Sequence, residues 1–186
     1  VNGLIVPERD AQLSPLDRGF TLADGLFETM VALGERIFRL RDHFSRLQSG
    51  ADILRINLPP EHVLSDAVRE TLRRNARDSS VVRLTVTRGM DPGRGLDVSP
   101  DITSTVIVRV TPWDGPSTSI PQGQSVIIST VRRNDLSPLS RIKSISYVEA
   151  VIARLESRRS GAREALLCNT RGHLTGAASS NIFAII

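Results

Sequence analysis

Two kinds of apolar spacing alternate along the first 110 residues. Runs rich in apolar and β-branched residues predict strands. They cover residues 26–33, 36–40, 81–87 and 104–110. Between them, apolar residues recur at the spacing of one helix face from position 40 to position 57, and Pro59-Pro60 opens a second helix that ends near position 77. The dipeptide Asn2-Gly3 predicts a short hairpin at the start of the chain.

The last third of the chain repeats both patterns after a break. Residues 112–122 are rich in Pro, Gly and Ser, a composition that favours a linker. Ser146 and Glu149 have the spacing of a capping box, which predicts a helix from Ser146 to Gly161. Further strands are predicted at residues 125–131, 164–168 and 181–186.

These elements predict an α+β protein with two domains. We expect an N-terminal domain at 1–116, a linker at 117–123 and the first part of a second domain at 124–186. The sequence stops inside the apolar run 181–186, which would leave a strand unfinished. We therefore expect the C-terminal domain to be incomplete and the protein to continue beyond Ile186.

The composition excludes several classes of protein. The 186 residues are 40% apolar and 24% charged, a balance typical of globular proteins. The chain shows neither a run long enough to cross a bilayer nor a basic-then-apolar signal pattern, so we expect no membrane partner. Cys168 alone cannot form a disulfide framework, and a reducing cytoplasm is the expected location. Because Cys168 lies in an apolar run, its simplest role is that of a small core residue.

The net charge of +4 and the pI near 10.4 raise the question of nucleic-acid binding. The arginines are spread along the chain and interleaved with acids, and only 4% of the residues are aromatic. This distribution predicts neither a basic stripe along the surface nor an aromatic platform on which bases could stack. We expect no nucleic-acid partner, and we expect no metal ion.

Lysine occurs once among the 24 basic residues, at position 143. Arginine does not lose its proton in proteins, whereas a lysine amine can become nucleophilic and form an imine. Lys143 lies three residues before the predicted N-cap Ser146 and two after Arg141. Both positive potentials would lower the pKa of its amine. The alternative is an exposed loop lysine that is single by chance.

Four stretches carry a resemblance to a known family. They are LDRGFTLADGLFETM (16–30), RIFRLRDHFSRL (36–47), IKSISYVEAVIARLES (142–157) and GAREALLCNTRGHLTGAASSNIF (161–183). In the order and spacing of these motifs, the chain resembles the fold-type IV enzymes that use pyridoxal 5'-phosphate (PLP), namely branched-chain and D-amino-acid aminotransferases and aminodeoxychorismate lyase. The resemblance implies a two-domain fold, PLP as cofactor and a homodimer with pockets near the interface.

The resemblance assigns roles to two basic residues. Lys143 matches the lysine that binds PLP as a Schiff base, and Arg46 matches the arginine that grips the cofactor phosphate. The planar fork of a guanidinium suits a phosphate, which gives the second assignment a physical basis. Taken alone, Arg46 would be read as an exposed cation on a helix.

Three further positions match the substrate side of the family pocket. Phe27 and Glu28 lie where family members face the cofactor, although a phenylalanine on a strand is more often a core residue. Arg94, in a Gly/Pro/Asp loop, matches a loop arginine that holds the substrate carboxylate in D-amino-acid aminotransferases. A solvated loop arginine is the alternative for Arg94.

The cofactor-side segment contains one departure from the family. Ser179, Ser180 and Asn181 match residues that hydrogen-bond the ring hydroxyl or the phosphate, with turn formation as the alternative for Ser179. Gly176 stands where the family has a glutamate that pairs with the pyridine nitrogen. Without that carboxylate the electron sink of PLP is weakened, so we expect a slow catalyst. The family's glycine-rich phosphate loop would lie beyond Ile186.

The resemblance predicts transamination between an amino acid and a 2-oxo acid, with Lys143 as the Schiff-base lysine and as the residue that moves the α-proton. Aminodeoxychorismate lyase, which eliminates pyruvate with the same cofactor and lysine, is the nearest alternative. A catalytically impaired relative is the other alternative, because Gly176 replaces the usual glutamate.

Overall fold

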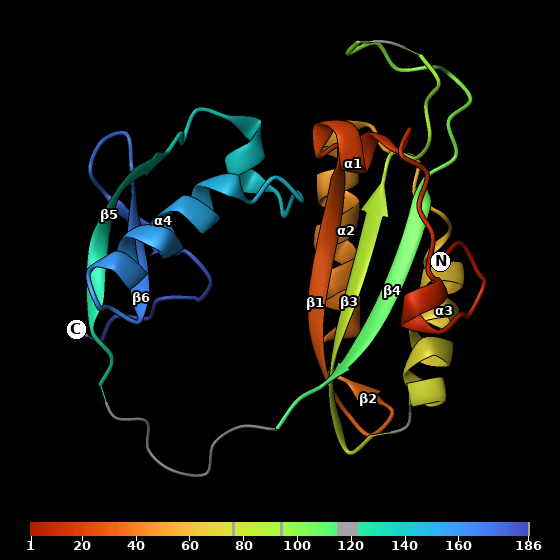
Figure 1. Cartoon of the computed structure of the whole chain (residues 1–186), viewed down its shortest axis with the longest axis horizontal. Helices are drawn as coiled ribbons and strands as arrows, with labels where there is room; N and C mark the ends of the chain where they lie inside the picture. Colours follow the sequence, from red (N-terminus) through yellow and green to blue (C-terminus); the bar gives the residue numbers. More distant parts are fainter. Residues whose placement is uncertain (76, 94, 115–122, 186) are drawn as a thin grey trace. The chain divides into compact units, whose positions relative to one another are not determined.

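The computed structural model describes residues 1–75, 77–93, 95–114 and 123–185. The chain divides into two compact units (Figure 1). One consists of Val1–Pro116 and Ile142–Ile145, and the other of Ser117–Arg141 and Ser146–Ile186.

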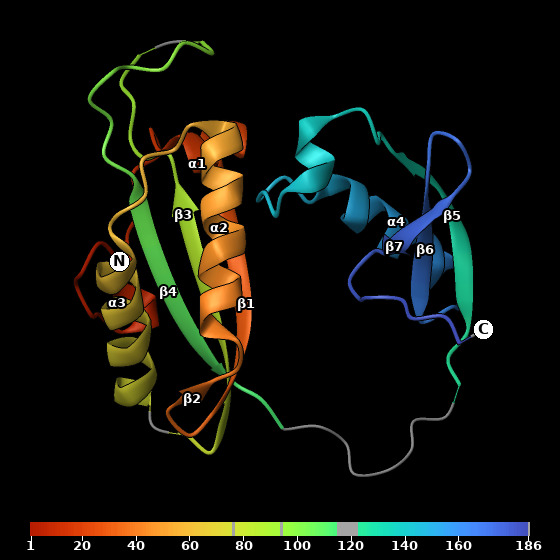
Figure 2. The same cartoon turned by 180° about the vertical axis from the view of Figure 1, so that it is seen from behind.

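The first unit is a four-stranded antiparallel sheet with the strand order β2-β1-β3-β4. The strands are β1 (Gly25–Leu33), β2 (Arg36–Ile37), β3 (Ser79–Thr87) and β4 (Thr105–Pro112). The helices are η1 (Glu8–Asp10), α1 (Arg18–Leu22), α2 (Leu40–Leu54) and α3 (Glu61–Asn75). Figure 2 shows that α2 and α3 cover the same face of the sheet.

The core of the first unit lies between this face and the two long helices. Alternate residues of the strands point toward the helices, as the period-2 geometry of a strand requires. The buried apolar side chains are Leu26, Met30, Ala32, Phe44, Leu47, Ala51, Ile56, Leu64, Val68, Leu72, Val82, Leu84 and Val86. The apolar spacing that predicted α2 and α3 therefore reflects one continuous core.

The second unit is smaller. Its strands β5 (Val126–Arg133) and β6 (Glu164–Asn169) are parallel, and β7 (Leu174–Ala177) pairs antiparallel with β6. The connection between β5 and β6 contains η2 (Pro138–Arg141) and α4 (Val148–Arg159). The buried core residues are small apart from one leucine; they are Ala150, Ala153, Ala165, Leu167 and Ala178.

Three local predictions were wrong. Residues 1–6 form no strand hairpin; Asn2 instead donates its N–H to Val106 O at 2.8 Å at the edge of β4. Helix α4 begins at Val148 with Tyr147 as N-cap and without a side-chain cap bond, so Ser146 does not form the predicted capping box. Residues 181–185 form no strand, because no described strand pairs with them and most of their side chains lie in solvent.

The predicted domain division remains a prediction, since most of the expected linker at 117–123 lies outside the described residues. One segment differs from the expected grouping. Ile142–Ile145, which the division at 124–186 assigned to the second domain, clusters with the first unit. Among the described residues, no helix combines the length and the apolar character that crossing a bilayer requires.

Candidate active site

Backbone hydrogen bonds place the Lys143 segment along the edge of β1 in the first unit. Strand β2 pairs only with Ala32 and Leu33, so the other end of that β1 edge is open to a second partner. Phe27 N donates to Lys143 O at 3.0 Å, and Ile145 N donates to Gly25 O at 3.0 Å. A lysine brought to a strand edge in this way has a fixed backbone position.

Gly25 permits this close approach. A Cβ atom at position 25 would lie 2.8 Å from Val86 O and 3.1 Å from Ile145 Cδ1. The first contact is with the backbone of β3, which cannot rotate away as a flexible side chain can. Glycine at position 25 therefore lets the Lys143 segment and β3 flank β1 at the same point.

The Lys143 side chain is half-buried and lies over an aromatic ring. Its Nζ is 4.4 Å from the centroid of the Phe27 ring, and Cζ of Arg83 is 3.8 Å from the same centroid. Phe27 is only 5% exposed. Phe27 thus gathers the single lysine and an arginine within cation–π distance of one buried ring.

Glu28, the next residue of β1, points to the opposite face and is 0% exposed. Its Oε1 accepts from Arg46 Nε at 2.7 Å, and its Oε2 lies 2.5 Å from Arg46 Nη2 and 2.7 Å from His43 Nδ1. His43 and Arg46 both lie on α2, one turn apart. The predicted substrate contact of Glu28 remains a prediction; the contacts that the structure shows are with these two helix side chains.

The Arg46 side chain is 52% exposed although its guanidinium is held by a buried carboxylate. A half-exposed arginine that is fixed on one edge suits the binding of a phosphate group, since its orientation is set before the ligand arrives. The residues present therefore fit the predicted phosphate contact.

The remaining predicted cofactor residues lie in the second unit. Ser179 Oγ and Ser180 Oγ donate to Glu164 Oε2 at 2.5 and 3.2 Å, and Asn181 is exposed. Burial raises the pKa of Glu164, but hydrogen bonds from Ser179 and the backbone, together with Arg154, lower it below its ordinary value. An ionised Glu164 thus orders the two serines.

Gly176 lies on β7, opposite Leu167 of β6. Among the described residues, no heavy atom would lie within 4 Å of a Cβ atom at position 176, but the backbone φ of +158° is one that residues with a side chain rarely adopt. A larger side chain therefore has space in the second unit but would strain the backbone there. Arg94, the predicted substrate-carboxylate residue, lies outside the described residues.

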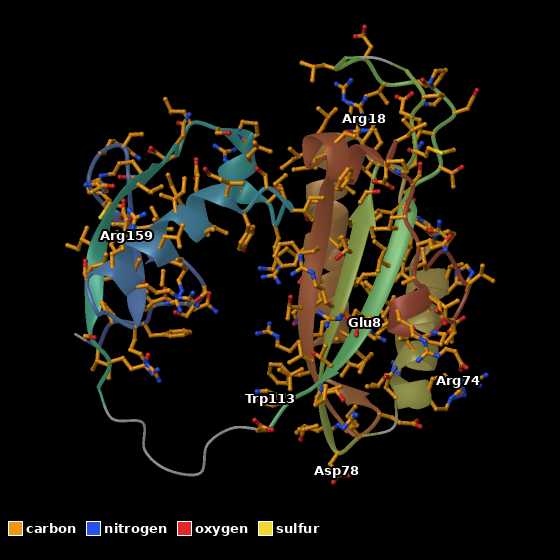
Figure 3. All side chains as sticks on the ribbon, in the orientation of Figure 1. Glu8, Arg18, Arg74, Asp78, Trp113 and Arg159 are labelled. Atoms are coloured by element: carbon orange, nitrogen blue, oxygen red, sulfur yellow. The ribbon has the colours of Figure 1, made fainter. Side chains whose placement is uncertain are left out.

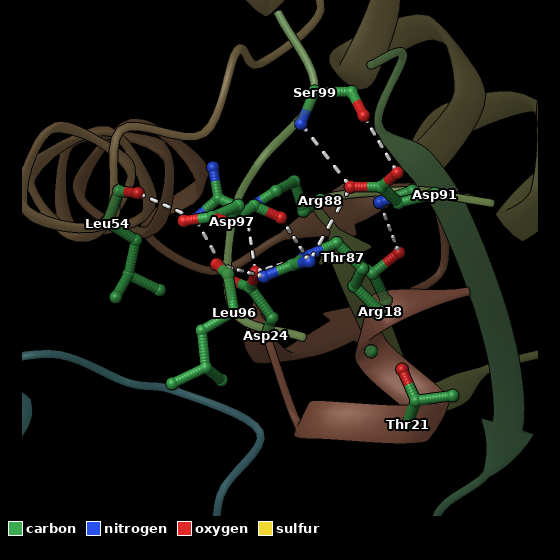
Figure 4. Close-up of polar contacts among 12 residues, drawn as sticks. Arg18, Thr21, Asp24, Leu54, Thr87, Arg88, Asp91, Leu96, Asp97 and Ser99 are labelled. Carbon is green, nitrogen blue, oxygen red and sulfur yellow. Dashed lines mark hydrogen bonds and ion pairs between the residues drawn. The ribbon is translucent and has the colours of Figure 1, made fainter. Parts of the chain in front are cut away.

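A network of buried charges, which the sequence analysis did not predict, anchors the loop after β3 (Figure 4). Asp24 accepts from Arg88 Nε at 2.6 Å and from Arg18 Nε at 3.1 Å. Arg18 also donates to the carbonyls of Leu96 and Asp97 and lies 3.5 Å from Asp91. The network holds the described part of this loop against α1.

His43 and Arg83 were also missed as neighbours of the site. The sequence signal for His43 was its position three residues before Arg46 on one helix face. The signal for Arg83 was a charge inside an apolar strand run. The strand register, which places Arg83 opposite Thr29, brings it within reach of Phe27, and sequence spacing did not give that register.

Comparison with known proteins decides the family. The profile of the family described as amino-transferase class IV matches residues 25–186, which include β1, the Lys143 segment and the whole second unit. The chain belongs to the class IV aminotransferases. The family resemblance drawn from the four motif stretches is confirmed.

Curated relatives and solved structures agree with this assignment. The chain is 33% identical to a Methanocaldococcus jannaschii protein provisionally named branched-chain-amino-acid aminotransferase, and 30% identical to D-alanine aminotransferase of Staphylococcus epidermidis. Both matches cover 100% of this chain and 64% of the relative. This chain therefore spans somewhat less than two thirds of these relatives.

The fold is that of solved class IV enzymes. The T.th. branched-chain aminotransferase, complexed with N-(5'-phosphopyridoxyl)-L-glutamate, superposes with a TM-score of 0.85 at 27% identity. The match covers 95% of this chain and 60% of that one. The enzyme from Thermoproteus uzoniensis, solved with norvaline, gives a TM-score of 0.83 at 26% identity over 95% of this chain and 61% of the other. The predicted fold class is confirmed.

Proposed function

We propose that the protein is a PLP-dependent aminotransferase that moves an amino group between an amino acid and a 2-oxo acid. The observation that supports this most is Lys143, the single lysine, whose segment is tied to the start of β1 by two backbone hydrogen bonds. Lys143 O accepts one from Phe27 N, and Ile145 N donates the other to Gly25 O. Its amine is the group that binds the aldehyde of the cofactor and carries the proton from the substrate α-carbon. The class IV relatives and their phosphopyridoxyl complex support the choice of cofactor.

The proposal assigns a role to each candidate site residue of the first unit. PLP, when bound, supplies an electron sink for the substrate α-carbon. Arg46 holds the phosphate, and the Phe27 ring packs beside the Lys143 amine and limits the water that reaches it. Arg83, stacked on the same ring, provides a cation that a substrate carboxylate can approach.

Further contacts belong to the proposal as the family resemblance implies them. Ser179, Ser180 and Asn181 are proposed to bind the cofactor, and Arg94 the substrate carboxylate. The working protein is proposed to be a cytoplasmic homodimer. The identities of the relatives favour branched-chain or D-amino acids as substrates.

Spectroscopy tests the proposal directly. The full chain incubated with PLP should develop a near-visible absorption band that borohydride abolishes, with the reduced adduct on the peptide that contains Lys143. Lys143→Arg, which keeps the charge but cannot form the imine, should give no band. An unmodified Lys143 peptide after reduction would refute the proposal. Assays with L- and D-amino acids and with aminodeoxychorismate then separate transamination from pyruvate elimination.

An impaired catalyst is the second candidate, and Gly176 favours it. A glycine places no carboxylate at the position where the family's glutamate pairs with the pyridine nitrogen. In that case the cofactor band forms normally, while turnover with every amino acid stays low. Comparing band formation with turnover separates the two candidates.

A further inference from the structure

The carboxylate of Glu28 is the most deeply buried acid beside the candidate site. It is 0% exposed and contacts Arg46 Nε at 2.7 Å, Arg46 Nη2 at 2.5 Å and His43 Nδ1 at 2.7 Å. A carboxylate that loses its water must be paired and hydrogen-bonded, since an uncompensated buried charge is strongly destabilising. Both carboxylate oxygens are satisfied here by side chains of α2.

The geometry of the pair is asymmetric. Glu28 sits on a central strand in the core, whereas the Arg46 side chain is 52% exposed at the surface of α2. An arginine with that exposure otherwise samples many rotamers, which a ligand would have to restrict on binding. The two parallel bonds from Nε and Nη2 fix the plane of the guanidinium as well as its position.

We propose that Glu28 is a positioning residue, which orients Arg46 for the phosphate of PLP, with His43 as the second donor that holds the carboxylate. This inference rests on the proposed function. It gives Glu28 a role that differs from the substrate contact expected from the sequence. Glu28 acts through Arg46 and touches neither cofactor nor substrate.

The role predicts a specific defect. If Glu28 orients Arg46, its loss should weaken binding of PLP while leaving binding of pyridoxal, which lacks the phosphate, nearly unchanged. Fixing one rotamer-rich side chain changes affinity by about two- to tenfold. A residue with a merely structural role would instead lower the affinity for both compounds by the same factor.

The experiment compares the affinities of the full chain for PLP and for pyridoxal, measured by absorbance titration. In Glu28→Gln the ratio of the two affinities should fall about tenfold, which corresponds to about 1.4 kcal/mol. The matched control is Glu70→Gln on α3, which removes a carboxylate that pairs with Arg73 and accepts from Arg74 Nε at 2.8 Å. Arg74 is labelled in Figure 3. The control should keep the wild-type ratio.

Two further variants keep the test decisive. If Glu28→Gln does not fold, Glu28→Asp keeps the buried charge but shortens the side chain by one methylene, and the ratio should still fall. Arg46→Lys keeps a cation but loses the fork, so adding Glu28→Gln to it should cause no further loss of the ratio. If the double variant instead lost the affinity ratio by the product of the two single-variant factors, Glu28 would act independently of Arg46, and the inference would be overturned.

The outcomes separate the two proposals. A wild-type chain that forms no borohydride-reducible adduct with PLP overturns the proposed function and this inference with it. A wild-type chain that binds PLP in preference to pyridoxal, together with an unchanged ratio in the Glu28 variants, overturns this inference alone.

Discussion

Replacing Asp24 by asparagine should destabilise the first unit by about 3 kcal/mol, at the lower end of the range for breaking a buried ion pair. Asp24 accepts from Arg88 Nε and Nη2 at 2.6 and 3.0 Å and from Arg18 Nε at 3.1 Å. The side chains of Arg18 and Arg88 are 8% and 11% exposed, so water cannot fully replace the lost charge. The lower end applies because Arg18 keeps Asp91 as a partner, and Arg88 keeps backbone carbonyls at the end of α2.

Urea denaturation followed by fluorescence measures this effect. Trp113 is the only tryptophan, and its backbone N–H donates to Ser79 O at 3.2 Å within the first unit. With a slope of about 2 kcal/mol per molar urea, the midpoint should fall by about 1.5 M. The control is Asp42→Asn, which breaks the exposed Arg39–Asp42 pair and should change stability by less than about 1 kcal/mol. Equal midpoints for Asp24→Asn and the control would refute the reasoning.

The same pair predicts a pH dependence. Burial raises the pKa of Asp24, but the hydrogen bonds and charges of Arg88 and Arg18 lower it below its ordinary value. Because the folded-state pKa lies below the unfolded value of about 3.9, the carboxylate stabilises the fold above about pH 4, and this contribution disappears as the pH falls through the folded-state pKa. The stability difference between wild type and Asp24→Asn should therefore narrow in acid.

Two glycines give further predictions. Gly25→Ala would place Cβ 2.8 Å from Val86 O, so it should displace the Lys143 segment and reduce the yield of the reducible PLP adduct several-fold. The control is Gly123→Ala, whose Cβ meets no heavy atom of the described residues within 4 Å and which should leave the yield unchanged. Equal yields of the two variants would contradict the assigned role of Gly25. Gly176→Glu restores the family carboxylate in open space, although the φ of +158° strains the backbone of any residue with a side chain. The turnover number of the folded variant should rise at least tenfold, measured with the best substrate of the amino-acid panel. An unchanged turnover would mean that the missing carboxylate does not limit the rate.

The sequence predicted the positions of helices and strands better than the contacts that their side chains make. The spacing of apolar residues located α2, α3 and the strands of the first unit, because burial of one face determines both the spacing and the element. Ser146 failed as a cap because a capping box requires only four residues and occurs by chance. Its side chain makes no cap bond, and the helix begins two residues later.

The candidate site shows the same limit. The sequence singled out Lys143 by its chemistry and Arg46 by its motif, and the roles of both residues remain predictions. The contact between Glu28 and Arg46 joins a strand to a helix 18 residues later, and no local pattern encodes it. The Arg18–Asp24–Arg88 network likewise depends on tertiary packing, which brings together side chains separated by 64 residues along the chain.

The backbone pairing of the Lys143 segment with β1 determines the face of the sheet to which the lysine side chain points. Side chains on a strand edge alternate between the two faces of the sheet, so a shift of one residue in the pairing of Ser144 with Leu26 would turn the lysine amine to the opposite face. Substitutions around Lys143 that preserve the two edge hydrogen bonds leave this direction intact. An insertion or deletion of one residue in the 142–145 segment reverses it, even though the lysine itself is still present.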